Sequence, residues 1–328
     1  MAPQPQDAGC GINDYGGLPR SDYRSPAREV LVTEVYPDLP EAQPSKTIDP
    51  KRVGISKTTI VAGSLCGRKA YFGENVRLPD GSRVQTPLNA RMAFGVALDT
   101  ATEYALFKER AGNSWDIETS VHKGLRALLE RGNTTFVDDA FSAELREAMT
   151  QFKSEIVDKG VLPINEHLML QGLNGESLKS GDLIGTPDII AWDAVNLVGR
   201  IIDVKAGARK KSALDLFGPE LSFYAALFAD AFPEASLPEI AYLTWVRTKE
   251  PSWQYLATQA TYQHLAIAAE YAEATRALVK ARSAASVPFT RTYCSDCTYA
   301  KPIPEASFEG CAVGRQFAPQ EEVKSTQA

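Results

Sequence analysis

The chain has 328 residues, of which 44% are hydrophobic and 23% charged, and its formal net charge is −6. This length and composition are typical of a globular protein with a large core, and no apolar run is long enough to span a bilayer. The negative charge argues against a protein that coats nucleic acid through many Lys and Arg contacts, but it is compatible with an enzyme that has a local basic rim. The first ten residues lack the basic-then-apolar order of a secretion signal, so we expect a cytoplasmic protein of a bacterium or phage.

Eight of the 20 prolines lie in residues 1–50, which have neither a helical nor a strand period. We expect this segment to be a disordered leader, and 316–328 to be a disordered tail of similar character. The intervening residues, 51–315, are expected to form one domain.

Within 51–315 the hydrophobic pattern predicts helices first, then strands, then a mixture of both. Helices are expected over 55–72, 89–112, 117–131, 139–158, 219–232 and 260–285. Strands are expected over 166–172, 182–193, 199–207, 239–247 and 253–260, with Asn174-Gly175 as a hairpin turn. This order predicts an α/β fold in which helices flank a mixed central sheet.

The most informative strand reads IIDVKAG, where alternation places Asp203 and Lys205 on the same face. Asp188 lies fifteen residues earlier in GTPDII, so a hairpin joined by a polar turn at 193–196 would bring both aspartates together. Two carboxylates repel unless a cation lies between them, and hard oxygen ligands favour Mg²⁺ or Mn²⁺ over zinc. The alternative is an exposed Asp–Lys ion pair, which contributes less than about 1 kcal/mol.

The segments GTPD, IDVKAG and ELSFY together resemble the PD-(D/E)XK nuclease superfamily, and in particular its RecB-type branch. The resemblance implies a restriction-endonuclease-like core in which Asp188, Asp203 and the Val204 carbonyl hold a metal ion. It also implies that Lys205 steadies the water that attacks a phosphodiester.

Two further positions follow from the same resemblance. Glu220 and Tyr224 match the helical motif of the branch, with Glu220 standing where glutamine is usual. In FGVALDTATE, Asp99 stands where the branch has a histidine that binds metal, and a carboxylate is a harder ligand that suits Mg²⁺.

The cysteines are similar to those of AddB-like subunits and CRISPR-associated exonucleases, with one ahead of the nuclease core and three after it. They are Cys66, Cys294, Cys297 and Cys311. The resemblance implies a 4Fe–4S cluster that forms a C-terminal clasp, and zinc bound by four cysteines is the alternative. Thirteen residues separate Cys297 from Cys311, a longer gap than usual, but such a loop closes at modest entropic cost. Cys10 is left over and expected to be unligated.

The resemblance therefore implies a metal-dependent DNA nuclease, more specifically an exonuclease in DNA processing, recombination or repair. Its expected partners are single-stranded DNA or duplex ends, together with recombination or helicase proteins. The sequence has no GxxxxGK[ST] loop, so we expect no helicase or ATPase motor in this chain. Arg209, Lys210 and Lys211 follow the acidic strand and either bind the phosphate backbone or form a solvated loop. The alternatives are a non-catalytic DNA-end-binding or scaffold subunit with the same fold, and a structural zinc protein.

Overall fold

The computed structural model describes residues 55–84, 88–110, 113–131, 135–162, 168–170, 178–180, 183–193, 198–290, 294 and 297–316. The expected leader, Cys10, the Asn174-Gly175 turn and nearly all of the expected tail lie outside the described residues. Within the described part of the chain, no helix has the length and apolarity needed to cross a membrane.

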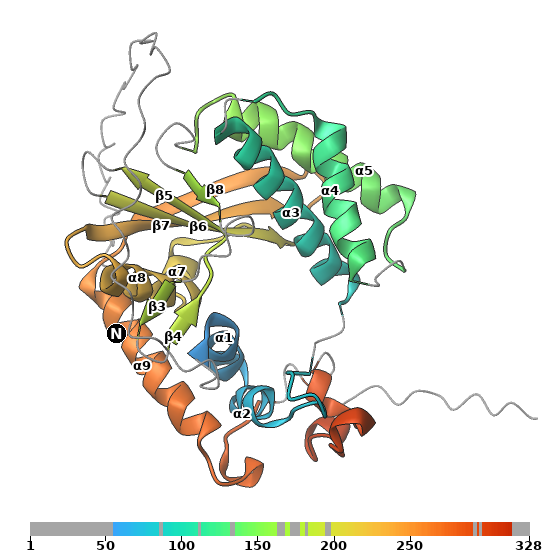
Figure 1. Cartoon of the computed structure of the whole chain (residues 1–328), viewed down its shortest axis with the longest axis vertical. Helices are drawn as coiled ribbons and strands as arrows, with labels where there is room; N and C mark the ends of the chain where they lie inside the picture. The colour runs from blue at the N-terminus through green and yellow to red at the C-terminus, as the bar shows by residue number, and fades with distance from the viewer. Residues whose placement is uncertain are drawn as a thin grey trace, which may run out of the picture. The chain divides into compact units, whose positions relative to one another are not determined.

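Helices dominate both ends of the domain (Figure 1). The early helices are α1 (Lys57–Leu65), α2 (Gly67–Asn75), α3 (Ala90–Arg110), α4 (Ile117–Glu130) and α5 (Asp139–Gln151), which continues as a π-helical segment, Phe152–Val157. The later helices are α7 (Ala213–Leu216), α8 (Pro219–Ala231) and α9 (Tyr262–Val279), followed by 3-10 turns at Ala284–Ser286, Thr298–Ala300, Pro304–Ala306 and Gly314–Gln316.

The strands form two sheets. They are β1 (Ile55–Ser56), β2 (Leu168–Leu170), β3 (Leu178–Ser180), β4 (Leu183–Gly185), β5 (Ile189–Asp193), β6 (Val198–Gly207), β7 (Ser236–Val246) and β8 (Ser252–Gln259). The larger sheet has the order β2-β5-β6-β7-β8, and the smaller has the order β1-β4-β3. In the larger sheet β6 and β7 are parallel and the other pairs antiparallel, so the predicted mixed sheet is confirmed.

The expected hairpin between the two acidic segments is also confirmed. Strands β5 and β6 are antiparallel neighbours, with Ile189 opposite Ile202. The connection from β6 to its parallel neighbour β7 passes through α7 and α8, as a parallel pair requires. This crossover places α8 against the sheet beside β6.

The prediction of one strand over 182–193 was wrong, because this segment divides between the two sheets. Strand β4 ends at Gly185 in the small sheet, and β5 begins at Ile189 in the large one. Pro187 lacks an N–H group and restricts Thr186, so a continuous ladder is interrupted there. The predicted helix over 55–72 likewise breaks at Cys66, whose backbone is extended.

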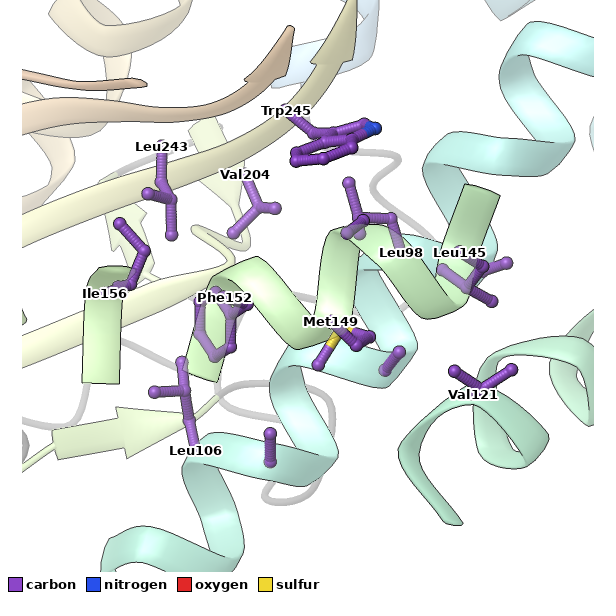
Figure 2. Packing of buried hydrophobic residues seen from close by; sticks show 14 of the residues in the cluster. Leu98, Leu106, Val121, Leu145, Met149, Phe152, Ile156, Val204, Leu243 and Trp245 are labelled. Carbon is purple, nitrogen blue, oxygen red and sulfur yellow. The ribbon is translucent and has the colours of Figure 1, made fainter. Parts of the chain in front are cut away.

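Strand β6 is buried on both faces. On one face Val204 packs with Leu243 and Trp245 of β7 against α3, α5 and the π-helical segment, in a cluster that also contains Met149 and Phe152 (Figure 2). On the other face Ile201 and Tyr242 pack against the aromatic residues of α8. Because apolar residues cover both faces of β6, the polar residues near the end of this strand are also held in the interior of the protein.

Candidate active site

The Asp203 carboxylate is completely buried, with 0% of its side chain exposed. Lys205 lies two residues further along β6, and its Nζ forms ion pairs with Asp203 Oδ2 and, at 3.0 Å, with Glu220 Oε1. The alternative of an exposed Asp–Lys pair on the surface is therefore contradicted. A buried carboxylate requires this kind of cationic partner, because burial of an isolated charge is strongly unfavourable.

Asp188 lies in the bend between β4 and β5, directly before the hairpin. Its Oδ2 accepts a hydrogen bond from the backbone N–H of Val204 at 2.7 Å. The pairing with β5 starts at Ile189 opposite Ile202, so the Val204 backbone extends past the end of β5. In a strand the N–H and C=O of one residue point to the same edge, which places the Val204 carbonyl on the edge occupied by Asp188.

Helix α8 contributes Glu220 in its first turn and Tyr224 one turn later. Burial raises the pKa of Glu220, but Lys205 and Lys57 outweigh it and lower the pKa to about 2, so this carboxylate stays ionised. The Tyr224 hydroxyl donates to the Thr186 carbonyl at 2.7 Å and fixes the segment that carries Asp188. The Glu220 carboxylate thus forms ion pairs with two lysines, whereas the sequence resemblance predicted only one lysine in the site.

The second lysine, Lys57, is a site residue that the sequence reasoning missed. Its Nζ lies 2.9 Å from Glu220 Oε1 and 3.3 Å from Asp203 Oδ1, and 5.1 Å from the centre of the Tyr224 ring. Burial opposes its charge, yet the Asp203 and Glu220 carboxylates raise its pKa above the usual value. No local pattern marks Lys57, which is separated by 146 positions from Asp203 in the sequence.

Asp99, from α3, lies close enough to Asp203 and Lys205 for their charges to act on its carboxyl. Burial and, next, the charge of Asp203 raise the pKa of Asp99 to about 6. Burial and the carboxyls of Asp203 and Asp99 likewise raise the pKa of Asp188 well above its usual range. The structure therefore brings together all three aspartates that the sequence proposed as metal ligands.

Four carboxyl groups meet two ammonium groups in this cluster, namely those of Asp99, Asp188, Asp203 and Glu220 and those of Lys57 and Lys205. If every carboxyl is ionised, one divalent cation balances the remaining negative charge. Hard carboxylate oxygens suit Mg²⁺ or Mn²⁺, so the donor set fits such an ion. In the described residues no three carboxylate, histidine or cysteine side chains form a ready-made metal site, and a lysine contacts each of the two Asp203 oxygens.

Comparison with known proteins agrees with this geometry. The sequence pattern of the PD-(D/E)XK nuclease superfamily matches residues 55–301, which is more than half of the chain. The chain belongs to the PD-(D/E)XK nuclease superfamily. The resemblance inferred from GTPD and IDVKAG is thereby confirmed at the level of the superfamily.

Among solved structures, the chain is similar to a crystal structure from Eubacterium rectale of a protein whose exonuclease assignment is provisional. The two are 11% identical with a TM-score of 0.48, and the match covers 77% of this chain and 89% of that one. No curated protein matches the chain.

The three basic residues that follow β6, Arg209, Lys210 and Lys211, differ in their contacts and exposure. Arg209 forms a two-pronged ion pair with Asp215, at 2.8 and 2.9 Å. Lys211 Nζ lies 4.3 Å from the Tyr242 ring centre, and the Lys211 backbone exchanges hydrogen bonds with the Gln254 side chain. Lys210 is exposed between them.

The cysteines lie where α2 meets the C-terminal segment. Burial raises the pKa of Cys297, and the nearby Cys66 and Cys294 thiols add to this increase. Cys311 is buried in a cluster with Phe72 and Tyr299, against which Cys297 also packs. These four cysteines form no disulfide. Among the described residues, no three His, Cys, Asp or Glu side chains are placed so that they could hold one metal ion. The residues thus gather at one place, but the geometry of a cluster site is not shown.

Proposed function

We propose that this protein is a divalent-metal-dependent deoxyribonuclease, and specifically an exonuclease of the RecB-type branch that acts in DNA processing, recombination or repair. The observation that carries the proposal is the buried Asp203, which lies between two lysines beside Asp99 and Asp188. A scaffold subunit has no need to bury these mutually repelling carboxyls, whose charge the two lysines balance only in part.

The metal ion would be held by Asp99, Asp188, Asp203 and the Val204 carbonyl. When bound, it would act as a Lewis acid toward the phosphate and lower the pKa of water. Lys205 is held at the same place by Asp203 and Glu220, so it is positioned to orient water and to stabilise negative charge that develops on the phosphate. The Val204 N–H orients Asp188, and the Tyr224 hydroxyl fixes Thr186 two residues before it.

The test is cleavage of end-labelled single-stranded and duplex DNA in Mg²⁺ or Mn²⁺ by the wild type, Asp203→Asn and Lys205→Met. Both variants should lose about 100-fold or more in rate, as expected for the removal of central electrostatic groups. Glu270→Gln, at an exposed position on α9, is the control and should cleave normally. Undiminished cleavage by either variant would contradict the assigned site.

A circular single-stranded DNA of the same length tests the exonuclease assignment. Resistance of the circle, together with stepwise shortening of the linear strand, would support it. Rapid cleavage of the circle would show an endonuclease instead. No cleavage of any DNA by the wild type would favour the DNA-end-binding subunit.

We propose further that Cys66, Cys294, Cys297 and Cys311 bind a 4Fe–4S cluster, with zinc as the alternative. The mutual influence of three of these thiols and the burial of the fourth support this assignment. Protein purified without oxygen should contain iron and absorb visible light, and Cys297→Ser should lose both. Stoichiometric zinc in colourless protein would favour the alternative.

A further inference from the structure

The Asp203 carboxylate has a different lysine on each of its two oxygens. Lys57 Nζ lies 3.3 Å from Oδ1, whereas Lys205 Nζ contacts Oδ2. Both ammonium groups also contact the same oxygen of Glu220, Oε1, at 2.9 and 3.0 Å. The proposed chemistry gives a role to Lys205 and leaves Lys57 unexplained.

Lys57 is positioned by backbone pairing. Strands β1 and β4 are parallel, with Ser56 opposite Ile184, so the chain enters α1 beside the segment that leads from β4 to Asp188. The Ser56 side chain accepts a hydrogen bond from the Thr59 N–H and caps α1. Lys57 is therefore the first residue of a capped helix, where unpaired backbone N–H groups add partial positive charge.

A lysine in this position competes with a metal ion. Asp203 Oδ1 cannot be fully shared between an ammonium group and a divalent cation, because their charges repel at such short range. If the cation takes this oxygen, Lys57 keeps only Glu220 Oε1, which Lys205 also uses. Only 22% of the Lys57 side chain is exposed, so its charge then requires a further anion. In a nuclease that anion is a phosphate of the substrate, and a lysine ammonium binds phosphate well as a point charge.

We propose that Lys57 is a second lysine of the active centre that exchanges partners. It holds Asp203 Oδ1 in the metal-free protein, yields this oxygen to the divalent cation, and then donates to a DNA phosphate while Glu220 and the Tyr224 ring keep its side chain in place. This proposal rests on the proposed function and adds a residue to the same site.

The exchange is tested by two equilibrium measurements on Lys57→Met in the full-length protein. The first is the Kd for Mn²⁺ of chelator-treated protein without DNA, by electron paramagnetic resonance. Because the competing ammonium is gone, Mn²⁺ should bind at least about threefold more tightly. In an Asp203→Asn background the same change should have little effect, since the contested oxygen is altered.

The second measurement is the Kd for a 5′-labelled single-stranded oligonucleotide in Ca²⁺. Lys57→Met should weaken this binding by about fivefold or more and reduce its salt dependence by about one charge. Lys57→Arg keeps the charge and should retain most of the affinity. Lys123→Met is the matched control, since Lys123 also lies beside a tyrosine ring, 5.7 Å from Tyr104, but on α4.

An unchanged Kd in either measurement would overturn the exchange, because it requires both partners. A purely structural ion pair would lower the thermal stability of Lys57→Met without tightening Mn²⁺ binding, and that result would also overturn it. Neither measurement depends on cleavage. Failure of the nuclease assignment would instead appear as a wild type that cleaves no DNA, so the two failures are distinguishable.

Discussion

The Asp99 carboxyl should destabilise the metal-free protein at neutral and alkaline pH. Its pKa is raised from an ordinary 3.8 to about 6, which corresponds to about 3 kcal/mol when fully expressed. The folded protein binds the Asp99 proton more tightly than the unfolded chain does. The stability that this proton contributes is therefore complete below the pKa of Asp99 in the unfolded chain, and it is lost as the pH rises through the pKa in the folded protein. Because the side chain is partly exposed, we expect Asp99→Asn to raise the free energy of unfolding by about 1–3 kcal/mol near pH 8.

The assay is urea unfolding of wild type and Asp99→Asn in excess chelator at about pH 5 and about pH 8. The variant should gain stability at the higher pH and little at the lower pH, where Asp99 of the wild type is largely protonated. Added Mn²⁺ should stabilise the wild type more than the variant, because a ligand of the ion has been removed. A variant that is less stable than the wild type at the higher pH would refute the reasoning.

Three other predictions follow from the packing around the site. Gly185→Ala should lower the free energy of unfolding by about 1–3 kcal/mol and slow cleavage, because the new Cβ would lie 2.7 Å from Leu227 Cδ1 and 3.0 Å from Tyr224 Cε1. The control is Gly95→Ala on α3, whose Cβ would meet no atom within 4 Å. In urea unfolding this variant should keep wild-type stability or gain slightly. Tyr224→Phe leaves the Thr186 carbonyl without this donor and should cost about 1–2 kcal/mol in the same assay, and unchanged stability would argue against a role in fixing the Asp188 segment. Lys210→Ala should weaken DNA binding more than Arg209→Ala does, because Asp215 already neutralises Arg209, and the reverse order in a titration with labelled DNA would contradict this assignment.

The hairpin was predictable because its information is local. Strands β5 and β6 follow one another in the sequence, both contain runs of apolar residues, and only a short segment joins them. The proximity of Asp188 to the end of β6 follows directly from that pairing. The break at Thr186-Pro187 also had a local signal, since proline interrupts a ladder, although the apolar residues on both sides suggested one continuous strand.

The small sheet and its consequences were not predictable in this way. Strand β1 has only two residues, too short for a detectable alternation, and its partner β4 lies far along the chain. This pairing is what delivers Lys57 to Asp203. Tyr242 reaches Glu220 at 3.4 Å through the register between β6 and β7, which sequence alternation alone does not determine.

The two lysines explain how the chain can assemble its carboxylates before any metal ion arrives. A buried Asp203 without cationic partners would be strongly unfavourable, and its neighbours Asp99 and Asp188 already respond to the crowding with raised pKa values. Lys205 is fixed to the same strand as Asp203, so it remains nearby in every state of the site. Lys57 is the first residue of α1, and only side-chain contacts hold it to the carboxylates. Of the two, Lys57 is therefore the cation that can leave Asp203 without disturbing β6, which is the property that an exchange with a metal ion requires.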